Sequence, residues 1–212
     1  MNIYVSDITN LLDLPGSGQL TPARRARMQR YIRLEDRARC LAAGLLLRRV
    51  FGAEAAQRIA VTPLGKPYLP GGAHFSLSHS GSKVVLLTSA HEAGVDVEQI
   101  VPYCQAVARQ VFSPREQAWL HEQGTDEAFY RLWTGKESIM KALGLGFQLP
   151  PESFEIHPEV HVPNHVLNRA WYLHWQRLDG HMLCCAASVP DEAFILTPLS
   201  REELLNPRNT EE

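Results

Sequence analysis

The sequence has few cysteines and no long hydrophobic run. Its 212 residues include four cysteines, whose spacing matches neither a disulfide framework nor a CxxC metal site: Cys40, Cys104, Cys184 and Cys185. No stretch approaches the length of a membrane span, and the first residues lack the basic and apolar regions of a secretory signal. We therefore expect reduced, mostly buried thiols in a cytoplasmic protein.

Charge is nearly balanced overall but unevenly distributed. The chain has 21 basic and 23 acidic residues, a formal charge of −2. Residues 21–49, however, contain nine arginines against two acidic residues, so this segment carries +7 and the remainder −9. A concentrated cationic surface indicates an anionic ligand or partner. Composition alone does not decide whether the partner of this surface is nucleic acid, a membrane or an acidic protein.

Hydrophobic spacing predicts a mixed fold. A strand is expected at 2–8, then a helix that begins after Thr21 and runs to Val50 with a break near 34–36. Residues 58–100 are rich in Gly and Pro and contain three short apolar or alternating runs, which predict a small antiparallel sheet. Two helical segments with glycines at their ends follow at 113–124 and 125–144, and strand-like runs lie within 153–198, the first at 154–157.

The order strand, helix, sheet thus occurs twice, with helices segregated from strands. This segregation favours an α+β fold over a doubly wound parallel fold. We expect two α+β halves that meet near Pro102, with boundaries 1–102 and 103–212.

Three carboxylates are candidates for one site. Alternation in GVDVE places Asp96 and Glu98 on one face of a strand, and Glu137 and Lys141 lie four residues apart on one side of a helix. Taken singly, either pair is more typical of a solvated surface. Gly135 within that helix costs about 1 kcal/mol relative to Ala, which predicts close approach of another backbone or a ligand. If the pairs meet, their oxygens suit Mg²⁺ shared with phosphate.

Cations lie on the segments that lead to Asp96. Lys66 and Pro67 form a Gly-Lys-Pro turn, and His79 stands between Ser78 and Ser80. A single histidine of this kind is more often structural. Together with the arginines of the early helix, these groups would surround a small polyphosphate with hydrogen-bond donors.

Several ordered motifs resemble one family. GVDVE at 94–98, followed by WTGKESIMKALGLG at 133–146, resembles the paired signature of the 4′-phosphopantetheinyl transferases. Other segments resemble the longer, surfactin-synthetase-activator type of that family: RLEDRAR at 33–39, GKP at 65–67, FSLSHSG at 75–81 and FSPRE at 112–116.

The resemblance implies a pseudo-dimer of two similar α+β halves with coenzyme A in the cleft between them. It implies transfer of 4′-phosphopantetheine from coenzyme A to a serine of an apo acyl or peptidyl carrier protein, a holo-acyl-carrier-protein synthase reaction that releases adenosine 3′,5′-bisphosphate. Mg²⁺ is the expected metal, with Mn²⁺ as a substitute. The resemblance also implies a cytoplasmic monomer that binds neither nucleic acid nor membrane.

The resemblance assigns roles residue by residue. Asp96, Glu98 and Glu137 match the metal ligands, and Glu137, Lys141 and Asp96 are the catalytic candidates, with Glu137 as general base. The residues expected to bind the coenzyme are Arg24, Arg27, Arg39, Lys66, Pro67, Ser78, His79 and Lys141. Cys40 stands where a phosphate-contacting hydroxyl is common, and Glu116 fits either catalysis or a capping box with Ser113.

Two alternatives remain open at this point. A metal-dependent nuclease would also use an Asp-x-Glu strand and a nearby lysine, with the arginine-rich helix on a nucleic-acid backbone. A non-catalytic module that binds acidic proteins would use the basic surface alone. Neither alternative explains the order of GKP, SHS, GVDVE and WTGKES along the chain.

Overall fold

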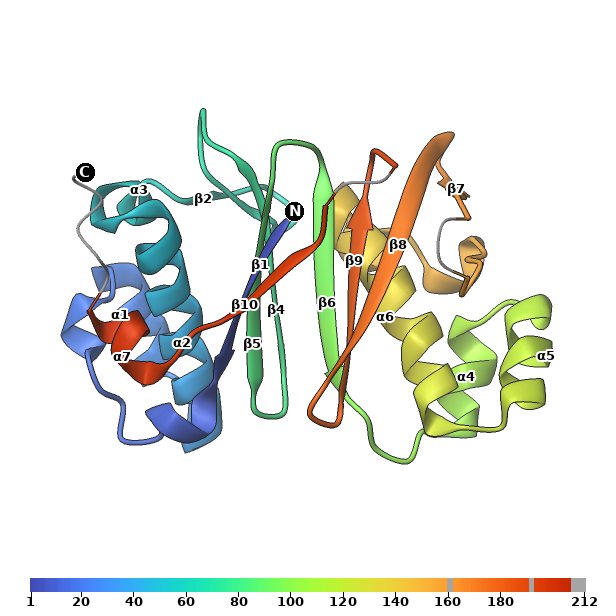
Figure 1. The fold of residues 1–212 in the computed structure, drawn as a ribbon, viewed down its shortest axis with the longest axis horizontal. Coiled ribbons are helices and arrows are strands. Elements are labelled where there is room, and N and C mark those ends of the chain that lie inside the picture. The colour runs from blue at the N-terminus through green and yellow to red at the C-terminus, as the bar shows by residue number, and fades with distance from the viewer. Residues whose placement is uncertain (160–161, 191–192, 207–212) are drawn as a thin grey trace.

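A computed structural model describes residues 1–159, 162–190 and 193–206. Two four-stranded sheets lie between two groups of helices (Figure 1). The α-helices are α1 (Pro22–Gln29), α2 (Leu34–Phe51), α3 (Ala53–Gln57), α4 (Gln105–Val111), α5 (Pro114–Gln123), α6 (Asp126–Leu143) and α7 (Arg201–Leu205). No helix in these ranges is long and apolar enough to cross a membrane.

The first sheet has the order β10-β1-β5-β4 and the second β6-β9-β8-β7. Their strands are β1 (Asn2–Asp7), β4 (His74–Ser80), β5 (Lys83–Ser89), β6 (Ala93–Gln99), β7 (Asn164–Val166), β8 (Arg169–Leu178), β9 (His181–Ala187) and β10 (Ile195–Pro198). All pairs are antiparallel except β1 with β10. A separate ribbon joins β2 (Ala60–Val61) to β3 (Pro67–Tyr68).

Three apolar clusters hold these layers together. One packs α2 against the first sheet, and another packs α6 against the second. The third lies between the sheets, where side chains such as Val85 and Val95 are fully buried. The α+β class and the two similar halves expected from the sequence are therefore confirmed, each half consisting of one sheet and its own helices (Figure 1).

The early helix differs in detail from the expectation. Thr21 caps α1 by accepting a hydrogen bond from the Arg24 N–H, and Pro22 occupies its first turn, as expected. The break lies at 30–33, however, before the expected position near 34–36. Arg37 donates to the Tyr31 carbonyl at 2.8 Å, so a side chain satisfies a carbonyl in this break.

Other segments also differ. Residues 154–157, expected as a strand, have no regular structure, and the helices α4 and α7 were not expected. β6 pairs within the second sheet, while β10 returns to pair with β1. The division at residue 102 stays a prediction. The cysteines are free thiols, as expected, and all but Cys104 are buried.

Candidate active site

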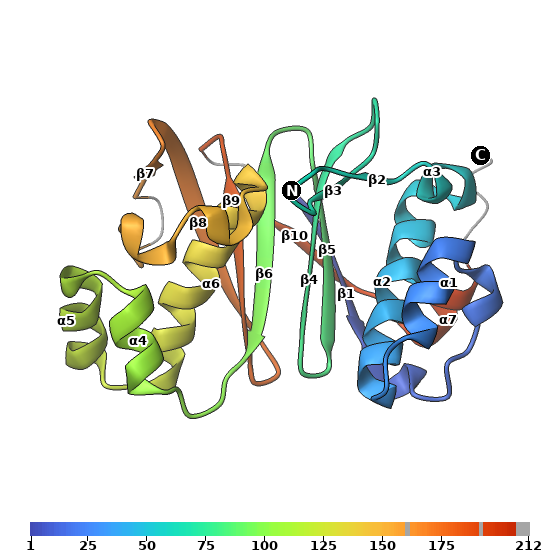
Figure 2. The same cartoon turned by 180° about the vertical axis from the view of Figure 1, so that it is seen from behind.

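The edge strands β4 and β6 of the two sheets lie side by side (Figure 2). Their backbones belong to different sheets, and serine side chains connect them. The hydroxyls of Ser76, Ser78 and Ser80 accept the backbone N–H groups of Val95, Val97 and Gln99 at 3.1, 3.2 and 3.1 Å. We call this set of contacts the serine seam. It aligns the serines of β4 with the carboxylates of β6.

Asp96 lies at the centre of the seam. Its Oδ1 accepts hydrogen bonds from Ser78 at 2.7 Å and from the Lys141 ammonium at 2.5 Å. Only 1% of Asp96 is exposed, yet its Oδ2 has no hydrogen-bond partner in the described part of the chain. An unpaired buried carboxylate oxygen costs on the order of 1–3 kcal/mol or more. This oxygen therefore fits a cation.

Glu98 and Glu137 complete a group of three carboxylates. Burial, followed by the charge of Asp96, raises the pKa of Glu98, while hydrogen bonds from Ser80 and Trp133 oppose the rise. Burial and the charges of Asp96 and Glu98 raise the pKa of Glu137 to about 7. The structure thus brings together Asp96 and Glu98 from β6 with Glu137 and Lys141 from α6, as the sequence suggested.

The carboxylates do not form a complete set of metal ligands by themselves. No three His, Cys, Asp or Glu side chains in the described ranges form a ready-made metal cluster, and Lys141 occupies the position beside Asp96. The unpaired Asp96 oxygen and the repulsion among the three carboxylates nevertheless suit a hard divalent cation. Such an ion would complete its coordination shell with oxygens of a bound ligand. The residues fit Mg²⁺, and their role as its ligands stays a prediction.

A glycine on β6 sets the position of α6. A Cβ at Gly94 would lie 2.0 Å from the Ser138 carbonyl oxygen and 2.5 Å from the Ala142 nitrogen, so the helix backbone rests directly on the strand. This contact places Glu137 and Lys141 beside β6. The expectation for Gly135 was wrong, because a Cβ there would meet the apolar side chains of Ile156, Trp175 and Leu173 rather than a backbone or ligand.

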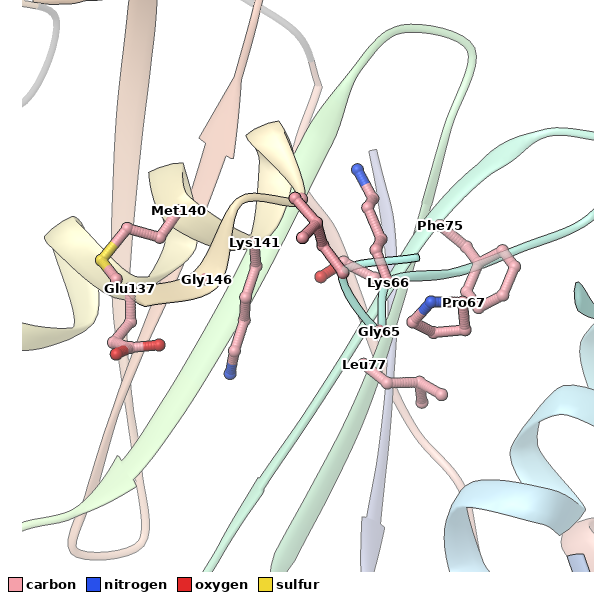
Figure 3. Close-up of a pocket in the computed structure, with 12 residues that line it drawn as sticks. Gly65, Lys66, Pro67, Phe75, Leu77, Glu137, Met140, Lys141 and Gly146 are labelled. Atoms are coloured by element: carbon pink, nitrogen blue, oxygen red, sulfur yellow. The ribbon is translucent and has the colours of Figure 1, made fainter. Parts of the chain in front are cut away.

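A pocket of about 230 Å³ opens beside the carboxylates (Figure 3). Glu137 and Lys141 extend toward it from α6, and Lys66 and Pro67 face them from the β2–β3 ribbon. Lys66 donates to the Ala142 carbonyl at 2.5 Å, which ties the ribbon to the end of α6. The rest of the lining is mostly apolar or glycine: Leu64, Gly65, Phe75, Ser76, Leu77, Met140, Gly144 and Gly146.

Two of the other expected cations, Arg39 and Arg27, lie near His79. The pKa of His79 is lowered, first because surrounding protein atoms displace water from the ring and then by the charges of Lys141, Arg39 and Arg27. Part of the side chain is nevertheless exposed. Arg39 donates to the Gly81 carbonyl at 2.6 Å, which holds it against the β4–β5 turn. Arg24 lies farther into the protein, and burial lowers its pKa.

Glu116 and Cys40 both contact other parts of the protein rather than the pocket. Glu116 completes the capping box of α5 with Ser113, accepts the Ile156 N–H at 2.8 Å and pairs with the fully buried Lys136 at 2.8 Å. These contacts use both of its carboxylate oxygens and explain it without catalysis. Cys40 is buried, and its thiol lies 3.9 Å from the Arg24 carbonyl oxygen.

Comparison with known proteins identifies the family. The model of the 4′-phosphopantetheinyl transferase superfamily matches residues 92–192, which include the carboxylates and Lys141. The chain is 30% identical over 208 residues to 4′-phosphopantetheinyl transferase Sfp of Bacillus subtilis (strain 168), covering 88% of this chain and 90% of that protein. The chain belongs to the 4′-phosphopantetheinyl transferase superfamily.

A second relative extends this assignment to the longer type of the superfamily. The 4′-phosphopantetheinyl transferase ffp of Bacillus subtilis is 31% identical over 199 residues, covering 86% of this chain and 88% of that protein. 4′-Phosphopantetheinyl transferase AcpT of Salmonella typhimurium is 41% identical, but over 88 residues. The chain is thus a phosphopantetheinyl transferase of the Sfp type, and the nuclease alternative receives no support from these relatives.

Some residues of the site were not expected. Met140, Phe75 and Leu77 line the pocket, and Ser80 contacts Glu98. The sequence FSLSHS alternates apolar or aromatic and hydroxyl side chains, and this alternation is the signal that would have found Phe75, Leu77 and Ser80. Met140 gave no such signal, because it also fits the buried face of a helix.

Proposed function

We propose that the protein transfers the 4′-phosphopantetheine group of coenzyme A to a serine of an apo acyl or peptidyl carrier protein, with Mg²⁺ bound, and releases adenosine 3′,5′-bisphosphate. One observation carries the proposal: a pocket between the two halves adjoins the buried carboxylate of Asp96, which contacts Lys141 and has one oxygen without a partner among the described residues. We propose that it acts as a monomer, since both halves of the site come from one chain.

The pocket and the cations suggest how coenzyme A would lie. The adenine would contact the turn of Lys66 and Pro67, where Phe75 and Leu77 supply apolar surface. The phosphates would meet His79, Ser78 and Lys141. The 3′-phosphate would lie toward Arg24, Arg27 and Arg39, where guanidinium groups suit bidentate contacts with phosphate oxygens.

Asp96, Glu98 and Glu137 would hold the metal. Bound Mg²⁺ would neutralise charge on the pyrophosphate oxygens of the coenzyme. The three carboxylates repel one another in its absence, which is the physical cause of the raised pKa values of Glu98 and Glu137 after burial itself.

In the proposed reaction the hydroxyl oxygen of the carrier serine forms a bond to the phosphorus of the phosphopantetheine group. The bond from that phosphorus to the bridging oxygen breaks, and adenosine 3′,5′-bisphosphate leaves with the electron pair. The serine proton would pass to the carboxylate of Glu137, which lies beside the proposed metal site on α6. Lys141 neutralises the charge on the leaving phosphate.

Mass spectrometry tests the proposal directly. Apo carrier proteins from fatty-acid, polyketide and peptide synthesis are each incubated with the protein, coenzyme A and Mg²⁺. We expect at least one of them to gain one phosphopantetheine group. If none gains mass at any Mg²⁺ or Mn²⁺ concentration, the proposed function is wrong.

Two carboxylate variants refine this test. Glu137→Gln should abolish transfer and leave the circular dichroism spectrum unchanged, because only the base and metal ligand are lost. Glu122→Gln, which alters an exposed carboxylate on α5, should transfer at the rate of the original protein. Near-normal turnover by Glu137→Gln would exclude Glu137 as the base.

A further inference from the structure

Two serines of the serine seam contact carboxylates as well as the backbone. We propose that Ser78 and Ser80 are positioning residues that orient Asp96 and Glu98 for the metal. This inference rests on the proposed function, since it assigns a role toward the Mg²⁺ site. It also assigns that role to β4, a strand of the first sheet, whereas the carboxylates themselves lie on β6 and α6.

The hydrogen bonds of Ser78 leave no freedom to its side chain. Its hydroxyl has one proton and two lone pairs. The proton goes to Asp96 Oδ1 at 2.7 Å, and the oxygen accepts the Val97 N–H at 3.2 Å and the Lys141 ammonium at 2.8 Å. Ser78 is buried, so no water replaces these partners readily.

This arrangement selects which oxygen of Asp96 is free. Ser78 and Lys141 both bind Oδ1, and Oδ2 has no partner within the described residues. The carboxylate is therefore held with one oxygen anchored to protein and the other available. A metal ligand needs that orientation, because hydrogen bonds from neighbouring side chains fix how a ligating carboxylate faces the ion.

Ser80, two residues after Ser78 on β4, also contacts both a backbone N–H group and a carboxylate. It accepts the Gln99 N–H at 3.1 Å and donates to Glu98 Oε2 at 2.5 Å. Ser76 supplies an internal reference, since it accepts the Val95 N–H at 3.1 Å but has no bond to a carboxylate in the described part of the chain. The three serines thus share a backbone contact, and two of them add a contact to a proposed metal ligand.

Metal binding measured apart from catalysis tests the proposal. Mn²⁺ is titrated into the purified protein without coenzyme A, and bound and free ion are separated by electron paramagnetic resonance. We expect Ser78→Ala and Ser80→Ala each to weaken Mn²⁺ binding by about 10- to 100-fold, the usual loss when a partner of a metal ligand is removed. Ser80→Thr, which retains a hydroxyl, should restore the affinity.

Ser76→Ala is the matched control. It removes a backbone contact of the same seam, so its thermal stability should fall as in Ser80→Ala, while its Mn²⁺ affinity should equal that of the original protein. An unchanged affinity in both Ser78→Ala and Ser80→Ala would overturn the proposal. An equal loss of affinity in all three variants would also overturn it, because the seam would then act through general stability.

Asp96→Asn separates this inference from the proposed function. If the original protein binds no Mn²⁺ either without or with coenzyme A, the proposed metal site itself is wrong. If the original protein binds Mn²⁺, Asp96→Asn does not, and the serine variants bind normally, only the positioning role is wrong. As a second readout, we expect Ser80→Ala to recover most of its kcat at saturating Mg²⁺, with little change in the KM for coenzyme A.

Discussion

At the scale of single residues, the environment of Glu137 links stability to pH. Its pKa is about 7 in the folded protein, against an ordinary value of 4.5. The folded state therefore retains this proton between pH 4.5 and 7, whereas the unfolded chain releases it. Without metal, the stabilisation from neutral Glu137 is complete below pH 4.5 and is lost as the pH rises through 7.

Glu137→Gln removes this dependence, since an amide carries no charge at any pH. We expect the variant without metal to be more stable than the original protein at pH 8, by about 1 to 3 kcal/mol in the free energy of unfolding. The difference should vanish near pH 4.5. Urea denaturation at both pH values measures it, and an equal difference at both would show that Glu137 does not titrate in this way.

At pH 8, added Mg²⁺ should make the original protein more stable than Glu137→Gln. A ligand that binds only the folded state stabilises it in proportion to the logarithm of its concentration over the dissociation constant. We expect the melting temperature of the original protein to rise with added Mg²⁺ and that of Glu137→Gln to rise less. Equal shifts in the two proteins would argue against Glu137 as a metal ligand.

At the scale of elements, a buried ion pair ties α5 to α6. Lys136 is fully buried, and its ammonium also donates to the carbonyls of Pro151 and Phe154. Glu116→Gln would leave that charge unpaired, which typically costs about 3–5 kcal/mol. Adding Lys136→Met should recover part of the loss. A double-mutant cycle by urea denaturation measures the coupling, and strictly additive losses would contradict it.

The contact of α6 with β6 depends on a single missing methyl group. Gly94→Ala would place a carbon 2.0 Å from the Ser138 carbonyl oxygen, so the helix must move away from the strand. We expect a loss of about 3 kcal/mol and a large fall in transfer activity, because Glu137 and Lys141 move with the helix. Gly18→Ala, where a Cβ meets nothing within 4 Å, should change stability by less than about 0.5 kcal/mol.

The elements also show what the sequence could predict. Caps and periodicity are local signals, so they predicted α5 and α6 with their ends at Gly124 and Gly144. Alternation in GVDVE predicted one face for Asp96 and Glu98. The pairing of β10 with β1 and the serine seam are contacts between distant segments, and no local pattern reports them. Gly135 was misread because a helix glycine looks alike whether a side chain or a backbone approaches it.

At the scale of the whole molecule, neither of the sequence segments 1–102 and 103–212 supplies all the strands of one sheet. β6 lies within residues 1–102 but pairs with β9, and β10 lies within 103–212 but pairs with β1. We expect separate fragments of these residues to be largely unfolded by circular dichroism, and an equimolar mixture to regain the native spectrum. A cooperative thermal transition in either fragment alone would contradict this expectation.

The parallel pair of β1 and β10 also bears on synthesis. A ribosome makes β1 long before β10, yet the register places Asn2 against Ile195 in the same sheet. The emerging chain must therefore keep the apolar face of β1 and β5 covered, by its own collapse or by a chaperone, until β10 leaves the exit tunnel. The first sheet therefore acquires its full set of strands only after β10 has been made.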